Sequence, residues 1–222
     1  MARANSAEAL SLDQPATVSA PARPLSRSQT IRRQKIINVA LSMLETRNSD
    51  QLQMRDISQS ANLALATVYR YFPSKELLLA RVFEQWCEGY WTRLARAADG
   101  RANTDRLIDL ASRSVEAYES HPNILVMISA LQLSNDPAVA AVMEDIRERA
   151  ERFFLDTLEG LDPADAAGIV DVVFAVMGAK LTEWVRGAIA IGEVHRAMET
   201  TIRLLLEYQD PSVGHTVMGA TE

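Results

Sequence analysis

The stretch Met54–Lys75, MRDISQSANLALATVYRYFPSK, decides the fold that we expect for this chain. Met54, Ile57 and Ala61 recur at helical spacing, so the first part of the stretch predicts a short helix with one buried face. Asn62 follows this helix, and asparagine tolerates left-handed backbone better than most other residues that carry a side chain. We therefore expect a tight turn at Asn62 and a second helix after it.

The second helix is predicted over Leu65–Phe72. Val68 and Phe72 are four residues apart, so they share a face and can pack inward. A helix of this length is about 12 Å long, which suits a DNA major groove about 12 Å wide. Pro73 should end the helix, and Ser74 can cap the next one. The spacing alone also fits a helical hairpin in an ordinary all-α core.

The aromatic end of this helix favours DNA binding over a plain hairpin. Tyr69-Arg70-Tyr71-Phe72 places three aromatic residues and one arginine in four positions, which is more than a core needs. Tyrosine hydroxyls and arginine guanidinium groups can donate hydrogen bonds to phosphate.

At these residues the chain resembles the TetR family of one-component transcriptional regulators. The resemblance rests on Arg55–Ile57 (RDI), Asn62–Leu63 (NL) and Ala66–Lys75 (ATVYRYFPSK). It implies an all-α homodimer of about nine helices, with a helix-turn-helix head on a larger helical body that binds ligand and dimerises. The residues around the motif also resemble actinobacterial repressors of steroid and lipid catabolism.

Several positions depart from the family pattern. Gln53 and Ala64 stand where the family usually has Thr or Ser caps, Ser58 replaces a usual Ala, and Asn62 and Ala66 replace usual glycines. Losing a cap costs about 1 kcal/mol, so these helix ends depend more on packing.

The resemblance and the exposed helix positions together define the expected contacts with double-stranded operator DNA. Leu65 and Ala66 could touch a thymine methyl group, and Lys75 lies in a first helical turn, which is a ready phosphate site. The expected DNA-binding residues are Arg55, Ala64, Leu65, Ala66, Thr67, Tyr69, Arg70, Tyr71 and Lys75.

Charge and composition exclude several other classes of protein. The net charge is −6, but residues 1–75 hold 10 basic and 5 acidic residues, whereas residues 76–222 hold 13 and 24. A basic end on an acidic body suits DNA docked at one end. The single cysteine, Cys87, excludes an internal disulfide, and we find no metal motif, phosphate loop or nucleophile motif. We therefore expect no metal, no cofactor and no enzyme activity.

No apolar run reaches membrane-spanning length, and the N-terminus lacks the apolar core of a signal peptide. We expect a cytoplasmic bacterial protein with no membrane partner.

The predicted organisation is a disordered tail over 1–28, a helix-turn-helix domain over 29–75, a ligand-binding and dimerisation domain over 76–210, and a flexible tail over 211–222. Outside the motif, helices are predicted over 30–44, 74–98, 104–120, 122–133, 137–160, 163–189 and 192–209.

The last two predicted helices carry the expected dimer surface. The segment 169–177 is apolar on nearly all sides, which is typical of a helix buried all round. The residues expected at the dimer interface are Val173, Phe174, Ile202, Leu205 and Leu206. The alternative is that these side chains form the core of a monomer.

Aromatic and methionine side chains of the body could line a cavity for a small apolar or amphipathic effector, such as a steroid or an acyl thioester. The candidates are Phe83, Trp86, Tyr90, Tyr118, Met127, Met143, Phe153, Phe154, Met177 and Trp184. Each of them could instead be plain core.

We expect a repressor that binds a palindromic operator as a dimer and is released by its effector. The alternatives are a TetR-like activator, a regulator without ligand, a helical protein-interaction module and, third, a helical enzyme. Salt-dependent binding to a palindromic DNA site would distinguish a DNA-binding regulator from a protein-interaction module or an enzyme.

Overall fold

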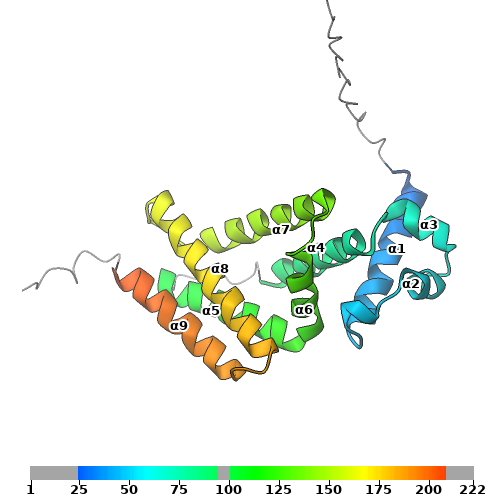
Figure 1. The fold of residues 1–222 in the computed structure, drawn as a ribbon. Helices are drawn as coiled ribbons and strands as arrows, with labels where there is room; N and C mark the ends of the chain where they lie inside the picture. Colours follow the sequence, from blue (N-terminus) through cyan, green and yellow to red (C-terminus); the bar gives the residue numbers. More distant parts are fainter. Residues whose placement is uncertain (1–24, 95–100, 209–222) are drawn as a thin grey trace, which may run out of the picture.

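The computed structural model describes residues 25–94 and 101–208, and over these residues the chain is all-α, as predicted (Figure 1). The elements are α1 (Arg27–Leu44), the 3₁₀ turn η1 (Ser49–Gln51), α2 (Met54–Ser60), α3 (Leu65–Tyr71), α4 (Lys75–Leu94), α5 (Asn103–Ser120), α6 (Pro122–Leu131), α7 (Pro137–Leu155), α8 (Pro163–Val185) and α9 (Ile191–Tyr208). Most of the two predicted tails, and the predicted end of the fourth helix at 95–98, lie outside the described residues. We call α1–α3 with η1 the head, and α4–α9 the body.

The first helix begins earlier than predicted, inside the segment expected to be a disordered tail. Ser26 caps α1: its hydroxyl accepts from the amide of Gln29 at 3.4 Å, and the Gln29 side chain accepts from the amide of Ser26 at 2.8 Å. This reciprocal pair is a capping box, and it supports a helix start at Arg27 rather than Thr30.

The head forms the predicted helix-turn-helix. Asn62 has φ 51°, which confirms the left-handed turn between α2 and α3. Gln53 and Ala64 stand at the N-caps of the two helices without a side-chain cap bond, as their departures from the family pattern predict. Val68 and Phe72 are buried at 0% and 1% exposure, so packing against the head core holds α3 in place.

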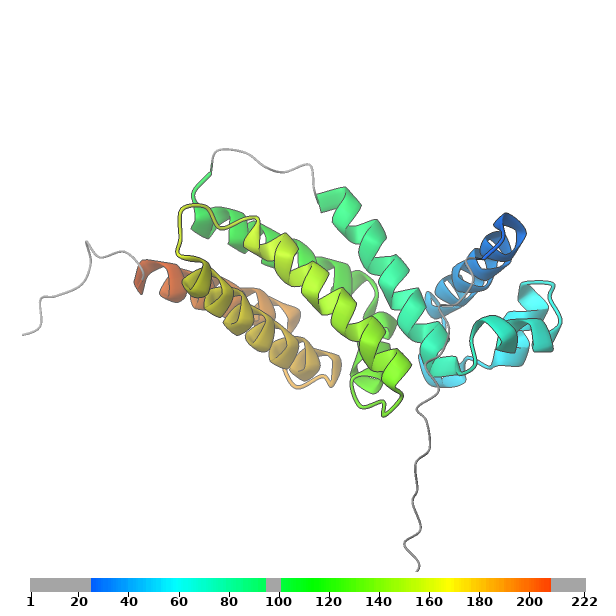
Figure 2. The same ribbon diagram turned by 90° about the horizontal axis from the view of Figure 1, so that it is seen from above.

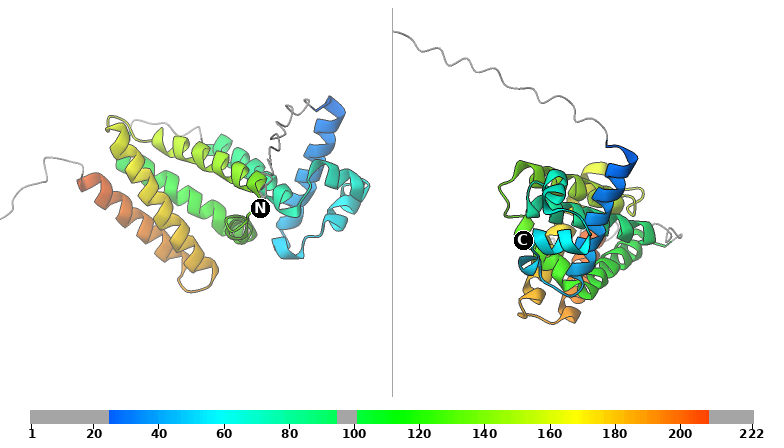
Figure 3. Two further views of the ribbon diagram at one scale, coloured as in Figure 1. Left: turned by 45° about the horizontal axis from the view of Figure 1, so that its top comes forward. Right: turned by 90° about the vertical axis from the view of Figure 1, so that its right-hand side faces the viewer.

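The helix α4 is the first helix of the body and follows directly on the head (Figure 2). Ser74 caps it, because the Ser74 hydroxyl accepts from the amide of Leu77 at 3.1 Å. α4 packs on α1 in the head and on α6 and α7 in the body. The head therefore sits at one end of the molecule, with α4 as its main link to the body (Figure 1 and Figure 3).

Two Asp-Pro pairs start body helices where the sequence predicts them. Asp136 and Asp162 accept from the amides of Ala138 and Ala164 at 2.8 and 2.9 Å, and so cap α7 and α8. The helix predicted over 104–120 begins one residue earlier than expected, at Asn103, with Ala102 at its N-cap.

Two apolar clusters form the core. The first runs from the head through α4 into α6 and α7, and the second fills the space between α5, α8 and α9. α8 and α9 lie side by side on the part of the body away from the head (Figure 1).

Among the described residues, no helix combines the length and apolar character that a membrane crossing requires.

Candidate DNA-binding surface and body cavity

The segment of α2, α3 and the turn between them presents most of the predicted DNA-binding side chains on the surface of the head. On α3, Val68 points into the core, and Tyr69 on the other side is 46% exposed. Arg55 is exposed on α2. The other predicted side chains on this surface are exposed Ala64, Ala66 and Arg70 and half-buried Leu65 and Thr67.

Tyr71 does not fit its predicted role as a phosphate contact. Its hydroxyl is buried and has no hydrogen-bond partner within residues 25–94 and 101–208, and its ring packs against the head core. The guanidinium of Arg70 lies 5.5 Å from the ring centroid of Tyr71. The hydroxyl is turned inward because Tyr71 lies only three residues from inward-facing Val68 on a helix of seven residues.

Lys75 makes structural contacts that were not predicted from the sequence. Its ammonium group donates to the carbonyl of Leu52 at 2.9 Å and to that of Asp50 at 3.5 Å. These bonds tie the first turn of α4 to the segment that leads into α2. One of the three ammonium donors remains for a phosphate.

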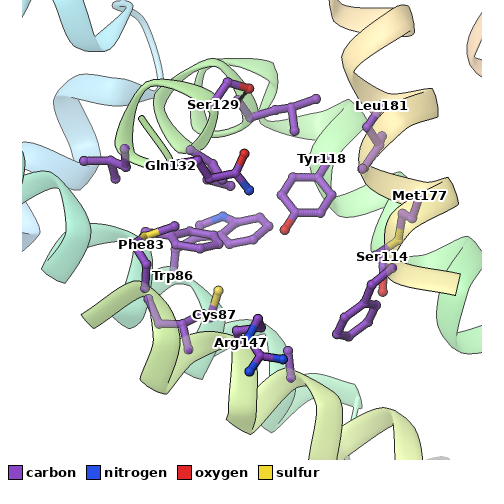
Figure 4. A pocket seen from close by; sticks show the side chains of 18 of the residues that line it. Phe83, Trp86, Cys87, Ser114, Tyr118, Ser129, Gln132, Arg147, Met177 and Leu181 are labelled. Atoms are coloured by element: carbon purple, nitrogen blue, oxygen red, sulfur yellow. Dashed lines mark hydrogen bonds between the residues drawn. The ribbon is translucent and has the colours of Figure 1, made fainter. Parts of the chain in front are cut away.

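A cavity of about 430 Å³ lies between the two apolar clusters of the body (Figure 4). Its walls come from α4, α5, α6, α7 and α8. Seven of the ten side chains proposed from the sequence line it: Phe83, Trp86, Tyr90, Tyr118, Met143, Phe154 and Met177.

The other three proposed side chains do not line the cavity. Met127 is 0% exposed and belongs to the first apolar cluster, so neighbouring side chains already fill the space around it. Phe153 and Trp184 are half-buried and pack against the second cluster. Each of them is on a helix that contributes to the cavity, but on a different face of that helix.

The polar residues of the cavity were not among the side chains predicted from the sequence. Ser114, Ser129, Gln132, Glu144 and Arg147 all contribute to its lining. Ser114 is only 4% exposed. Its position on the apolar face of α5 was visible as a hydroxyl within the helical repeat of Leu107, Leu110 and Ala111.

A short chain of hydrogen bonds fixes one wall of the cavity. The Ser114 hydroxyl donates to the carbonyl of Leu110 at 2.8 Å, so it accepts from the Tyr90 hydroxyl, which lies 2.9 Å away. Burial raises the pKa of Tyr90 to about 12, and this phenol therefore stays neutral at physiological pH.

Within the described ranges, no group of three His, Cys, Asp or Glu side chains could hold a metal ion.

Two of the five residues predicted for the dimer interface lie fully inside the protomer, and for these two the prediction needs correction. Val173 and Ile202 are 0% exposed in the second cluster. The Phe174 ring lies 4.7 Å from that of Phe154 and lines the cavity. Leu205 and Leu206 are half-buried against the same cluster. Side chains already buried within one protomer have little surface left to bury against another.

The outward-facing apolar residues of these two helices are different ones. Val172 on α8 is 41% exposed, and Leu204 on α9 is 64% exposed. Val172 is adjacent to fully buried Val173, and Leu204 is two residues from fully buried Ile202. Each helix therefore has one face toward the protomer core and another toward the surface.

Two sequence models of one family match the chain. The model described as "Bacterial regulatory proteins, tetR family" matches residues 36–82, and "Tetracyclin repressor-like, C-terminal domain" matches residues 100–205. The first match covers most of the head and the start of α4, and the second covers most of the body. The chain therefore belongs to the TetR family of transcriptional regulators.

Individual relatives agree with this assignment. The HTH-type transcriptional repressor KstR from Rhodococcus jostii (strain RHA1) is 25% identical over 182 residues, which cover 82% of this chain and 85% of that protein. A TetR transcriptional regulator from Rhodococcus sp. RHA1 has a similar fold, with a TM-score of 0.69 and 19% identity over 86% of this chain and 100% of that chain. FadR from Thermus thermophilus, a TetR-family repressor in complex with lauroyl-CoA, has a TM-score of 0.67 and 19% identity over 85% and 100% of the two chains.

Proposed function

We propose that this chain is a dimeric transcriptional repressor that binds an inverted-repeat operator and is released when a small apolar or amphipathic molecule occupies the body cavity. The observation that carries the proposal is that a single helix, α4, contacts the head and also lines the body cavity. The first turn of α4 is tied to the head through Lys75, and Phe83, Trp86 and Tyr90 further along it line the cavity. Similarity to KstR and to FadR with its lauroyl-CoA supports the proposal.

The proposed operator contacts come from α2 and α3. Exposed Arg55 and Tyr69 offer charge and a hydroxyl, and α3 is short enough to enter a major groove. Two heads held by one dimer would read two half-sites related by the same two-fold symmetry, so the operator should be an inverted repeat.

The proposed dimer surface is the outward face of α8 and α9. On α8 this face carries Gly168, Val172, Ala175 and Ala179, all exposed. A Cβ atom added at Gly168 would meet nothing within 4 Å, so there is open space above this part of the helix. Small side chains allow the helices of two protomers to approach closely. On α9, exposed Leu204 adds an apolar contact.

A polar cluster between α1 and α4 would transmit a shift of α4 to the head. The Gln85 side-chain amide donates to Asn38 at 2.8 Å, and the Gln34 amide donates to Asn38 at 2.9 Å and contacts Gln85. The guanidinium of Arg33 on α1 also lies 5.4 Å from the ring centroid of Phe72, beside the end of α3.

A second link runs through α6. The Trp86 ring meets His121 edge-on, with centroids 5.9 Å apart and an interplanar angle of 70°. Two residues later, the side-chain amide of Asn123 donates to the carbonyl of Leu44 at 3.0 Å, where α1 ends. A molecule that displaces Trp86 would therefore press on the segment that holds the end of α1.

The coupling that this mechanism needs is small. An effector lowers DNA affinity only if it prefers the arrangement of heads that does not fit the operator. A tenfold loss of affinity needs about 1.4 kcal/mol of difference between the two states.

The proposal is tested by fluorescence anisotropy on operator DNA selected from the chain's own genomic neighbourhood. Arg55→Ala should weaken binding at least tenfold without changing the helical circular dichroism spectrum. Arg152→Ala is the matched control, because Arg152 is an exposed arginine on α7, away from the head. Equal affinities of wild type and Arg55→Ala across salt concentrations would refute the proposed DNA surface.

A further inference from the structure

We infer that the body cavity takes an uncharged, ring-containing molecule whose oxygen atom accepts a hydrogen bond from Tyr118, rather than an acyl thioester of coenzyme A. The inference rests on the proposed function, because it names the chemical class of the effector. It is drawn from three properties of the cavity: the ring faces along one wall, the charge of the lining, and the hydroxyl that remains available.

Aromatic rings form one wall of the cavity. Phe83, Trp86 and Tyr90 follow each other along α4, and the neighbouring rings are 6.1 and 5.9 Å apart with interplanar angles of 22° and 6°. Tyr118 reaches Trp86 from α5 with centroids 5.3 Å apart. The stacked rings form a continuous, rigid apolar wall, which suits a rigid ring system better than a flexible chain. The cavity volume of about 430 Å³ lies in the lower part of the range for small-molecule sites, about 300–1,000 Å³.

Among the described residues that line the cavity, none carries an unpaired positive charge. The charged ones are Glu144 and Arg147, which pair at 2.6 Å, and Arg147 also pairs with Glu151. The hydrogen bond to Arg147 lowers the pKa of Glu144, and the reciprocal bond raises that of Arg147, so both stay ionised. Both are about half exposed, at 54% and 50%, which puts the pair at the rim.

A carboxylate or phosphate inside this cavity would therefore find no uncompensated cation. Burial of an unpaired charge is costly. At the rim, two carboxylates already share Arg147, so an anionic head group would also have to displace one of them. An uncharged molecule meets neither penalty.

Most of the other hydroxyl groups that line the cavity already have a hydrogen-bond partner. The Tyr90 hydroxyl donates to Ser114, and the Ser129 hydroxyl donates to the carbonyl of Leu125 at 3.1 Å. The Tyr118 hydroxyl points into the cavity beside Trp86 (Figure 4) and has no hydrogen-bond partner among the described residues. Burial raises the pKa of Tyr118, so its hydroxyl keeps its proton. A ketone or alcohol oxygen is the ligand group that it can satisfy.

The test uses three probes and two matched variants. Androst-4-ene-3,17-dione is an uncharged ring ketone, 3-oxoandrost-4-ene-17-carboxylic acid has the same rings with a carboxylate, and lauroyl-CoA is an anionic thioester. Binding is measured by titration calorimetry and by tryptophan fluorescence on the full chain. The dione should bind at least tenfold more tightly than the acid and the thioester.

Tyr118→Phe should weaken dione binding about tenfold. Tyr90→Phe removes a hydroxyl that Ser114 already occupies, and it should change the affinity less than threefold. Both variants keep the ring, and equal melting temperatures would establish that both are folded.

Tighter binding of lauroyl-CoA than of the dione, no binding of any probe, or equal effects of the two variants would each overturn the inference. DNA binding without any probe is measured in parallel. If lauroyl-CoA binds and releases DNA, the ligand class is wrong and the proposed function stands. If the chain binds no specific DNA at all, the proposed function fails.

Discussion

Truncation of Leu204 tests the proposed dimer surface quantitatively. Leu204→Ala removes three carbon atoms, each worth about 0.8 kcal/mol when fully buried. Leu204 is 64% exposed in the protomer, so this fraction of its surface is what a dimer can bury. The loss is then about 1.5 kcal/mol per protomer and about 3 kcal/mol per dimer, which is a roughly 150-fold weaker dissociation constant.

Sedimentation equilibrium over a wide concentration range measures this dissociation constant directly. Ile202→Ala is the control on the same helix, because Ile202 is 0% exposed. It should cost about 2–5 kcal/mol of protomer stability, seen as a lower melting temperature, while its folded fraction dimerises as wild type does. A Leu204→Ala protein with an unchanged dimer, or a wild type that stays monomeric, would show that the outward face of α9 is not the interface.

Three further predictions concern the head and its links to the body. Tyr69→Ala should weaken operator binding at least tenfold in an anisotropy titration while the thermal melt stays unchanged; a matching fall in melting temperature would mean that Tyr69 is structural. Asn123→Ala removes the bond to the Leu44 carbonyl, so DNA affinity without effector should change less than threefold while release by the effector weakens; unchanged release would exclude this link. Asn62→Ala should lower the free energy of unfolding by about 1 kcal/mol in urea, because alanine adopts the left-handed backbone at φ 51° less readily than asparagine. Asn62→Gly should not destabilise the protein, since glycine has no Cβ, and equal losses in both variants would refute this reasoning.

Local signals allowed the order of the helices to be predicted from the sequence. Val68 and Phe72 identify the buried side of α3 because only one side of that helix is apolar, and Asn62 marks its turn. Asp136 and Asp162, each followed by proline, mark two helix starts. The start of α1 was also readable, because Ser26 and Gln29 have the spacing of a capping box, but the polar composition of the tail obscured it.

The inward faces of the C-terminal helices could not be predicted in the same way. Between residues 169 and 177, α8 is apolar on almost every side, so periodicity does not tell Val172 from Val173. Only packing against α5 and α9 decides that Val173 is inside and Val172 outside. On α9, Leu204–Leu206 are consecutive leucines and pose the same ambiguity.

The cavity was predictable in composition but not in detail. Large aromatic side chains on α4 lie at helical spacing, and that pattern is visible in the sequence. Whether Met127 faces the cavity or the first apolar cluster depends on how α6 is rotated against α4, which is a tertiary property. The pairing of Glu144 with Arg147, which leaves the cavity without a free cation, likewise required the structure.

Selection of bound DNA from a random-sequence pool tests the central claim most directly. The purified chain is incubated with the pool, the bound fraction is amplified and sequenced, and the affinity for the enriched site is measured against salt. A dimeric repressor with two heads predicts an inverted repeat, with half-site centres about one helical turn or a simple multiple apart, and affinity that falls as salt rises. Enrichment of no sequence, or of a single site without a symmetry-related copy, would contradict the account.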